Sequence, residues 1–236
     1  MNPSNQPQEF DQFAKNYDHI LDESVRLSGE SSAFFMGQKI ALAARHCAQP
    51  GVTGRFLDFG CGVANARPFV RALLPGWTYE GVDVSEESLG VARSRHPDAS
   101  FSVFQHGNLA FADQSFDLVM AAVVFHHIPH DQHPSVISEI FRVLKPGGSL
   151  IISEHNPWSP ATRHVVASCP FDKDAVLLSP PYARRLLKTA RFTGVRSQFY
   201  LFFPRFLKLL RPLEHAMGWL PFGAQYFALG KRPPSS

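Results

Sequence analysis

The chain has 236 residues, of which 44% are hydrophobic and 18% are charged; this composition is typical of a folded domain and excludes an intrinsically disordered chain. No apolar run approaches the ~20 residues that cross a bilayer, and three widely spaced cysteines exclude a disulfide framework or a cysteine-based zinc site. The net charge of +3 is uneven, because residues 175–236 hold ten basic residues and one acid, whereas the rest of the chain holds 13 basic and 19 acidic residues. The sequence starts without the pattern of a secretory signal. We therefore expect a cytoplasmic protein without a metal, whose basic C-terminal part either is a solvated face or meets an acidic partner.

The first fifty residues predict two helices. Phe10, Phe13 and Tyr17 follow the i, i+3, i+7 spacing of a short amphipathic helix. A second helix is expected over 33–48 and ends at the Gln-Pro-Gly sequence of 49–51. Both helices precede the region in which strands and helices alternate.

From residue 51 onward, short apolar runs alternate with helical patterns, which indicates a parallel sheet with crossover helices. Pro146 and the two glycines after it end the helix before the fifth strand. The segment 204–223 is long for a hairpin loop, and we expect apolar, basic helical turns there, interrupted by Pro212. The predicted strands lie near 55–59, 77–82, 101–104, 116–122, 148–153, 195–203 and 224–229, and the predicted helices over 65–74, 86–96, 133–144 and 180–191.

The strongest local motif is the run 56–65 (FLDFGCGVAN), in which an apolar strand turns through glycines into a helix. Glycines allow a sharp turn and close approach of a ligand, and the N-terminus of the helix offers free N–H groups to an anion. Asn65 occupies the position where a dinucleotide-binding loop needs its third glycine, and the Gly-Lys-Ser/Thr of a phosphate-binding loop is absent. Asp58, two residues before the first glycine, suits a ligand with an ammonium group. The alternative is a glycine turn that only packs a helix on a strand.

A second acid, Asp83, ends the second strand about twenty residues after the glycine loop, the spacing at which an acid meets ribose hydroxyls. A carboxylate can accept two hydrogen bonds, which matches a vicinal diol. The alternative role is capping of the helix that starts at residue 86, but Ser85 can provide that cap.

Four ordered motifs over residues 52–153 and just beyond resemble the class I S-adenosylmethionine-dependent methyltransferases. The resemblance implies one Rossmann-like α/β domain with a seven-stranded, mostly parallel sheet, an antiparallel last strand, helices on both faces and N-terminal lid helices. It divides the chain 1–236 into lid helices (1–50), a cofactor-binding core (51–156) and an acceptor-side half (157–236) with the insertion 204–223. The motifs are LDFGCG at 57–62, YEGVDVS at 79–85, FADQSFDLVMAAVVFHHI at 111–128 and IFRVLKPGGSLIISEHN at 140–156.

The resemblance also implies the residues that bind S-adenosylmethionine. Gly60 and Gly62 would border the methionine part, and Asp83 would hold the ribose. Gln105 stands where the family often has an aspartate facing the adenine amine, and its carbonyl can accept the same bond. Ala64 replaces the third glycine of the loop and tightens the site. The predicted cofactor-binding set is Tyr17, Asp58, Gly60, Cys61, Gly62, Asp83, Val84, Gln105, His106 and Ala122, with Cys61 acting through its backbone and Tyr17 either facing the sulfonium or packing on the sheet edge.

Three histidines follow the fourth strand, in a segment that borders the transferred methyl group in the family. Histidine titrates near neutral pH and can take a proton from a hydroxyl acceptor. We expect His126 and His130 to be structural and His127 to be the candidate base. His155, just after the fifth strand, is the competing catalytic candidate.

The acceptor is expected to be a small-molecule or lipid-linked compound with an acidic end, methylated at oxygen, because segment 199–211 is rich in aromatic and basic residues. The segment 204–219 would hold that acidic end or make a weak peripheral membrane contact; packing on the sheet edge or a homodimer contact is the alternative. Nucleic acid is not expected as a substrate, since no recognition domain or Asn-Pro-Pro-Tyr motif is present. Two other function classes remain as alternatives. A nicotinamide-dependent oxidoreductase is disfavoured by Asn65 and by the lack of a Tyr-x-x-x-Lys pair. A non-catalytic cofactor-binding module is disfavoured by the intact glycine loop.

Overall fold

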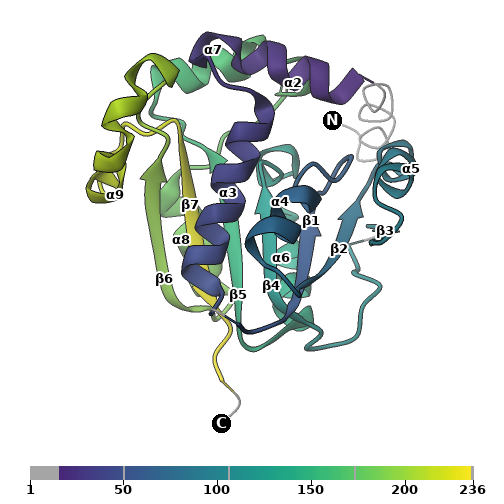
Figure 1. Cartoon of the computed structure of the whole chain (residues 1–236). Helices are drawn as coiled ribbons and strands as arrows, with labels where there is room; N and C mark the ends of the chain where they lie inside the picture. Colours follow the sequence, from purple (N-terminus) through teal and green to yellow (C-terminus); the bar gives the residue numbers. More distant parts are fainter. Residues whose placement is uncertain (1–15, 50, 106, 173, 235–236) are drawn as a thin grey trace.

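The computed structural model describes residues 16–49, 51–105, 107–172 and 174–234, and its centre is a seven-stranded sheet (Figure 1). The strand order is β3-β2-β1-β4-β5-β7-β6. β7 runs antiparallel to both of its neighbours, and the other pairs along the sheet are parallel. The predicted seven-stranded sheet with an antiparallel last strand is therefore confirmed. The strands are β1 (Arg55–Phe59), β2 (Thr78–Asp83), β3 (Ser100–Val103), β4 (Phe116–Ala122), β5 (Leu144–His155), β6 (Thr193–Tyr200) and β7 (Gln225–Lys231).

Helices cover both faces of the sheet, which explains why the central strands are continuous apolar runs rather than alternating ones. On one face, α6 (His133–Val143) and α8 (Pro180–Thr189) pack on side chains such as Leu57. On the other face, α3 (Ser32–Cys47), α4 (Arg67–Leu73) and α5 (Glu86–Arg95) pack on the alternate side chains. Successive residues of one strand thus belong to two different cores.

Serine side chains set the start of four helices. Ser85 accepts a hydrogen bond from the backbone N–H of Ser88 at 3.0 Å and caps α5. This bond confirms that Asp83 is not needed as the cap of that helix. Ser31, Ser159 and Ser179 cap α3, α7 (Pro160–Ser168) and α8 in the same way.

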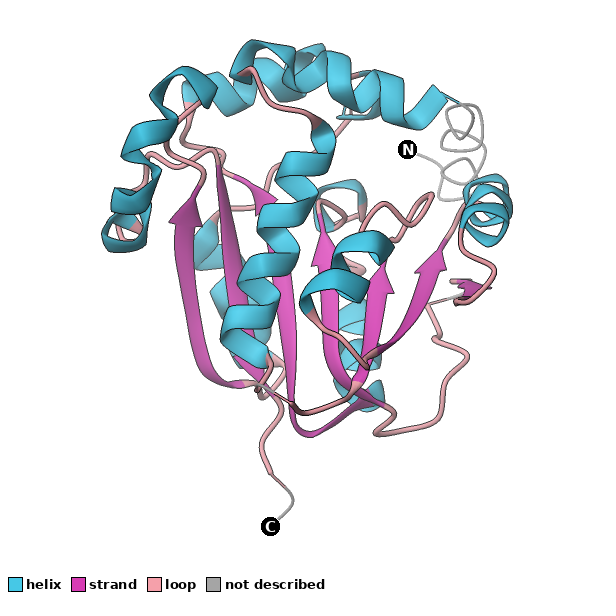
Figure 2. Ribbon diagram, in the orientation of Figure 1, coloured by secondary structure: helices cyan, strands magenta, loops and turns pink. Residues whose placement is uncertain are grey.

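A layer of short helices lies over the carboxyl ends of the strands, at the top of Figure 2. It contains α2 (Tyr17–Val25), η2 (Arg26–Ser28), α7, η4 (Pro170–Asp172), η5 (Arg205–Leu213) and α9 (Glu214–Met217). Phe10 and Phe13 fall outside the described residues, and Tyr17 begins α2. η5 and α9 are the helical turns expected in 204–223, with Pro212 inside η5.

Two segments differ from the expectation. No helix was predicted between the strand near 148–153 and the helix over 180–191, but α7 and η4 lie there; the pair Ser159–Pro160 is a cap followed by a proline at the first helical position. β5 begins at Leu144 rather than at 148, because Leu144 pairs with Phe116 of β4 through a register shift. None of the described helices is long and apolar enough to cross a membrane.

Candidate active site

A cavity of about 1390 Å³ lies between the carboxyl ends of the strands and the layer of short helices. The carboxyl ends of the strands are where open α/β sheets bind their ligands. The volume exceeds the roughly 300–1,000 Å³ that is usual for one small-molecule site. The cavity therefore has room for a cofactor and an acceptor together.

The glycine loop after β1 forms one wall of this cavity. Gly60 and Gly62 have φ angles of +76° and +52°, a conformation that favours glycine. The N–H groups of Gly60 and Cys61 donate to the carbonyl of Val82 at 2.8 and 3.0 Å, so the loop is fixed to β2. A Cβ atom on Gly60 would collide with the side chain of Val124. The loop can therefore keep this conformation only with glycine at this position.

Asp83 lies at the end of β2, on the cavity side of the loop. Its Oδ2 accepts a hydrogen bond from the N–H of Gly62 at 2.7 Å, and its Oδ1 accepts one from the N–H of Ser85 at 2.9 Å. These two bonds fix the plane of the carboxylate. Each oxygen has more than one acceptor site, so the group is suited to hold a vicinal diol.

Asp58 and Cys61 lie behind the glycine loop and are not among the residues that line the cavity. Asp58 is 4% exposed, and its Oδ2 accepts a hydrogen bond from the hydroxyl of Tyr79 at 2.6 Å. Burial raises the pKa of Asp58 to about 7. The expected contact of Asp58 with a ligand ammonium is therefore not provided by its side chain, which instead supports the loop from below.

The other predicted cofactor residues fall into two groups. Seven of the ten predicted cofactor residues line the cavity, whereas His106 is outside the described residues. The seven that line the cavity are Tyr17, Gly60, Gly62, Asp83, Val84, Gln105 and Ala122.

The third glycine position of the loop holds Ala64. Its φ of +62° is a left-handed conformation that is unfavourable for alanine.

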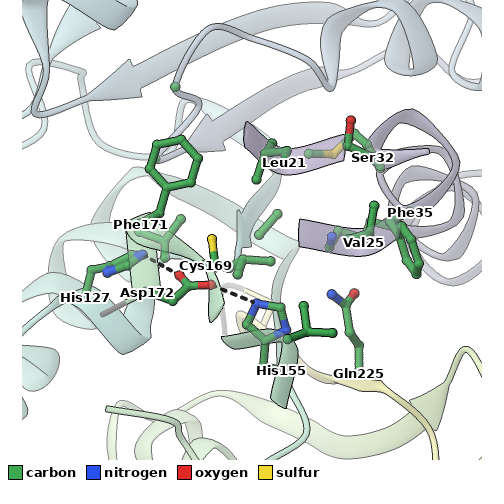
Figure 3. Close-up of a pocket in the computed structure, with 18 of the residues that line it drawn as sticks. Leu21, Val25, Ser32, Phe35, His127, His155, Cys169, Phe171, Asp172 and Gln225 are labelled. Atoms are coloured by element: carbon green, nitrogen blue, oxygen red, sulfur yellow. Dashed lines mark ion pairs between the residues drawn. The ribbon is translucent and has the colours of Figure 1, made fainter. Parts of the chain in front are cut away.

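Three histidines and an aspartate meet at the carboxyl ends of β4 and β5, and Figure 3 shows three of them, His127, His155 and Asp172. We call His126, His127, His155 and Asp172 the histidine cluster. Nε2 of His126 and Nε2 of His127 lie 3.2 and 3.4 Å from Oδ1 of Asp172, and Nε2 of His155 lies 3.8 Å from Oδ2. The four residues come from η3 (Phe125–His127), the end of β5, and η4.

Glu154 of β5 anchors the cluster from the protein interior. Its Oε1 accepts hydrogen bonds from the N–H groups of Val124 and Phe125 at 3.1 and 2.8 Å, and its Oε2 lies 2.6 Å from Nδ1 of His126. One carboxylate thus holds both the turn after β4 and the buried histidine. The turn needs this support because Val123 has a φ of +63°, which is unfavourable for a β-branched residue.

Burial and charge distinguish the three imidazoles. His126 is fully buried, and although burial alone would lower its pKa, the carboxylates of Glu154 and Asp172 raise it to about 10. The side chains of His127 and His155 are 21% and 14% exposed and line the cavity. Burial lowers the pKa of His127 and lowers that of His155 to about 4. His127 and His155, the two predicted catalytic histidines, thus differ from His126 in facing the cavity, and both lie beside the carboxylate of Asp172.

The other histidines after β4 support the packing. His133 begins α6, as expected, and its Nε2 lies 3.0 and 2.9 Å from the carbonyl oxygens of Phe125 and Ile128. His130 stacks on Tyr182 with the ring centroids 5.0 Å apart.

Three residues of the site were not identified from the sequence. Glu154 could have been found, because it is an acid inside the buried strand SLIISEH. Asp172 has no such signal, since it reaches the histidines only through the fold. Lys39 of α3 is 5% exposed and lines the cavity, and burial lowers its pKa to about 8.

A large part of the remaining cavity wall is apolar and aromatic. Arg211, one of the cations expected to meet an acidic acceptor, pairs with Glu30 at 2.7 Å and lies over the ring of Phe34. Its charge is therefore already neutralised. The aromatic lining includes Phe34, Phe35, Phe202, Phe203, Phe206 and Phe222.

Comparison with known proteins relates this site to one family. Residues 57–152 match the family model of the methyltransferase domain. The chain is 31% identical over 178 residues to a demethylmenaquinone methyltransferase from Streptomyces griseus, with 72% of each protein covered. It is 28% identical over 145 residues to a fatty-acid O-methyltransferase from Mycolicibacterium smegmatis, covering 60% of this chain and 52% of that protein. A phthiotriol/phenolphthiotriol dimycocerosates methyltransferase from Mycobacterium leprae is 31% identical over 145 residues, with 60% and 53% covered.

The match thus spans about half the length of the two mycobacterial relatives. Among solved structures, an S-adenosylmethionine-dependent methyltransferase from Archaeoglobus fulgidus superposes with a TM-score of 0.67 at 16% identity, over 86% of this chain and 95% of that one. At this identity the similarity concerns the fold alone.

Proposed function

The chain belongs to the S-adenosylmethionine-dependent methyltransferases, and we propose that it methylates an acidic oxygen, phenolic or carboxylic, of an apolar small-molecule or lipid-linked acceptor. The observation that carries this proposal is one cavity lined by two unlike groups of residues, which we call its two ends. Gly60, Gly62 and Asp83 form the end that suits the cofactor. An aromatic wall with Lys39 and the histidine cluster forms the other end.

The residues at the first end fit S-adenosylmethionine. Asp83 would accept hydrogen bonds from the ribose hydroxyls, because its carboxylate is already oriented by Gly62 and Ser85. Gly60 and Gly62 would contact the methionine part, since they lack the Cβ that would block its approach. When bound, the cofactor supplies a methyl group activated by the sulfonium for in-line attack by an acceptor oxygen. The protein's task is then to align the acceptor and exclude water.

Lys39 is the residue that favours an acidic acceptor. It is almost fully buried in the cavity wall, and no hydrogen bond or ion pair joins it to another described residue. A buried ammonium group gains strongly from a charged partner. An acceptor carboxylate or phenolate would provide that partner and place its oxygen near the cluster.

The histidine cluster would receive the proton when the acceptor is a phenol. His127 and His155 face the cavity, and Asp172 holds their Nε2 atoms. When bound, the cofactor would supply the methyl group and keep the electron pair on its sulfur, so the only proton left to move is that of a phenol. The phenolic proton passes to one of the two imidazoles. A carboxylate acceptor has no proton to lose, so it would not need this step.

The names of two relatives support an apolar acceptor. One relative is named for a fatty acid and the other for demethylmenaquinone. The aromatic wall of the present cavity is suited to molecules with a long apolar part.

The test is a methyl-transfer assay with labelled S-adenosylmethionine and three acceptors of similar length: hexadecanoic acid, a long-chain alkylphenol and hexadecylamine. We expect label in the acid or the phenol. Lys39→Met should raise KM for that acceptor by about tenfold or more, the scale of a lost charged contact, while Lys39→Arg keeps most of the affinity. His127→Ala or His155→Ala should slow phenol methylation by about 10²–10⁴-fold. Transfer to the amine alone, or an unchanged KM in Lys39→Met, would contradict the proposal.

An exposed apolar surface at the cavity mouth supports delivery from an anionic membrane. Phe206 and Phe222 line the cavity, yet 80% and 73% of their surfaces are exposed. Arg205 and Lys208 of η5 are exposed beside Phe206. Apolar groups flanked by cations bind anionic interfaces weakly and in a salt-dependent manner. Sedimentation with anionic and neutral vesicles tests this point, with the Arg205→Glu, Lys208→Glu variant expected to lose binding. Equal binding by the variant, or burial of this surface in a homodimer, would contradict it.

A further inference from the structure

The three imidazoles of the histidine cluster all direct the same atom, Nε2, toward one carboxylate; Figure 3 shows His127 and His155 on either side of Asp172. The ligand atoms of His126, His127 and Asp172 lie within 4.8 Å of one another. Ion pairing explains the position of His126, which lies between Glu154 and Asp172. His127 directs its Nε2 to the same oxygen, Oδ1 of Asp172, so that three potential ligand atoms meet there. Convergence of several ligand atoms on a common point is the property of a metal site.

The spacing of the cluster fits an ion at that point. Ligand atoms at 2.0–2.2 Å from a tetrahedral ion are separated from one another by ~3.4 Å. Nε2 of His126 and Nε2 of His127 lie 3.2 and 3.4 Å from the same oxygen, Oδ1 of Asp172. The cluster therefore needs little rearrangement to surround an ion of this size.

Glu154 provides the second feature of a metal site. A metal-binding histidine usually donates its other ring N–H to a carboxylate, which fixes the tautomer and the ring orientation. Nδ1 of His126 lies 2.6 Å from Oε2 of Glu154, and both residues are fully buried. With the proton on Nδ1, the lone pair of Nε2 points to the centre of the cluster. The negative charges of Asp172 and Glu154 would offset the charge of a divalent ion.

We propose that His126, His127 and Asp172 bind one divalent transition-metal ion of the Zn²⁺ class. Imidazole ligands suit zinc, iron, nickel and copper better than magnesium or calcium. Three protein ligands leave the fourth tetrahedral position free, and because His127 and Asp172 line the cavity, that position would be open to the acceptor side. It would there bind the acceptor oxygen and take over the activation that the imidazoles provide in the metal-free enzyme; this role, unlike the binding itself, rests on the proposed function. The proposal replaces the expectation of no metal, which considered only the cysteines.

The direct test is calorimetric titration of ZnCl₂ into chelator-treated protein purified without a histidine tag. We expect one Zn²⁺ per chain and no comparable binding of MgCl₂. His127→Ala and Asp172→Asn should each weaken Zn²⁺ binding by about 100-fold or more, because loss of an outer partner alone costs about 10–100-fold. His164→Ala is the matched control, since His164 lines the same cavity outside the cluster. Co²⁺ should give visible absorption bands in the wild type and in the control but not in the cluster variants.

Binding of S-adenosylhomocysteine is measured on every variant to show that it is folded. Zn²⁺ binding that is absent, or equal in His127→Ala and His164→Ala, would overturn the metal site. Zn²⁺ binding with no methyl transfer to any of the three acceptors would overturn the proposed function and leave the site standing. Equal methyl transfer by the metal-free and Zn²⁺-loaded protein would overturn the role of the ion in catalysis.

Discussion

Replacing Asp83 by asparagine separates the two tasks of its carboxylate, which are holding the glycine loop and binding the cofactor. In the ligand-free protein the two oxygens accept hydrogen bonds from the N–H groups of Gly62 and Ser85, at 2.7 and 2.9 Å. Asparagine keeps one oxygen, so one of these N–H groups loses its acceptor. The cost to the free energy of unfolding is about 1–3 kcal/mol.

The loss in ligand binding adds to this effect. If each carboxylate oxygen accepts a hydrogen bond from a ribose hydroxyl, removing one charged acceptor costs about 1.5–3 kcal/mol. The affinity for S-adenosylhomocysteine should then fall by about 10–100-fold. Isothermal titration calorimetry measures this change, and urea unfolding without ligand measures the change in stability.

Glu87→Gln is the control, because Glu87 is an exposed acid in the first turn of α5. It removes the same charge near the loop without touching the cavity, and both measurements should stay close to the wild type. A lower stability of Asp83→Asn combined with an affinity within about twofold of the wild type would refute the placement of the ribose at Asp83.

Three further substitutions test the wall formed by the glycine loop. The folded state raises the pKa of Asp58 to about 7 from 3.8, so the protonated carboxyl stabilises the fold fully below about pH 4, and this contribution is lost as the pH rises to about 7. Asp58→Asn removes this dependence: its stability relative to the wild type should rise between pH 4 and 7 by up to about 4 kcal/mol in urea unfolding, and a fall would contradict the assignment. Ala64→Gly should raise the stability by about 1 kcal/mol, because Ala64 has a φ of +62°; an unchanged melting temperature would argue against strain there. Gly60→Ala should lose about 2 kcal/mol or more of stability together with S-adenosylhomocysteine binding, since its Cβ would meet Val124, and normal binding would show that the loop adapts.

Local patterns in the sequence were sufficient to predict the sheet and to bring the glycine loop and Asp83 to one cavity. The buried strand that leads into Gly60 and the acid that ends β2 lie on neighbouring parallel strands. Their positions along the chain therefore determine their positions in space. The cap at Ser85 could be predicted for the same reason, because Ser85 and its partner Ser88 are only three residues apart in the chain.

The acceptor end could not be predicted in this way. Asp172 lies 46 residues beyond His126 in the chain, and Lys39 lies on a helix that precedes the first strand. Their meeting depends on how α3 and η4 pack over the sheet, which no local pattern encodes. Asp58 shows the opposite error: the motif placed it near the ligand, but the turn directs its side chain toward Tyr79.

The position of β7 has a consequence for synthesis on the ribosome. β7 spans Gln225–Lys231 and lies between β5 and β6, so β6 has no place in the described sheet until those residues have been made. Strands β1 to β5 can assemble earlier, because all five have been made before residue 156 and they pair with one another. During that interval the edge of β5 is open to pairing with other chains. A nascent chain of this protein should therefore depend on chaperones until its last strand emerges, and a truncation before residue 225 should leave a protein that aggregates.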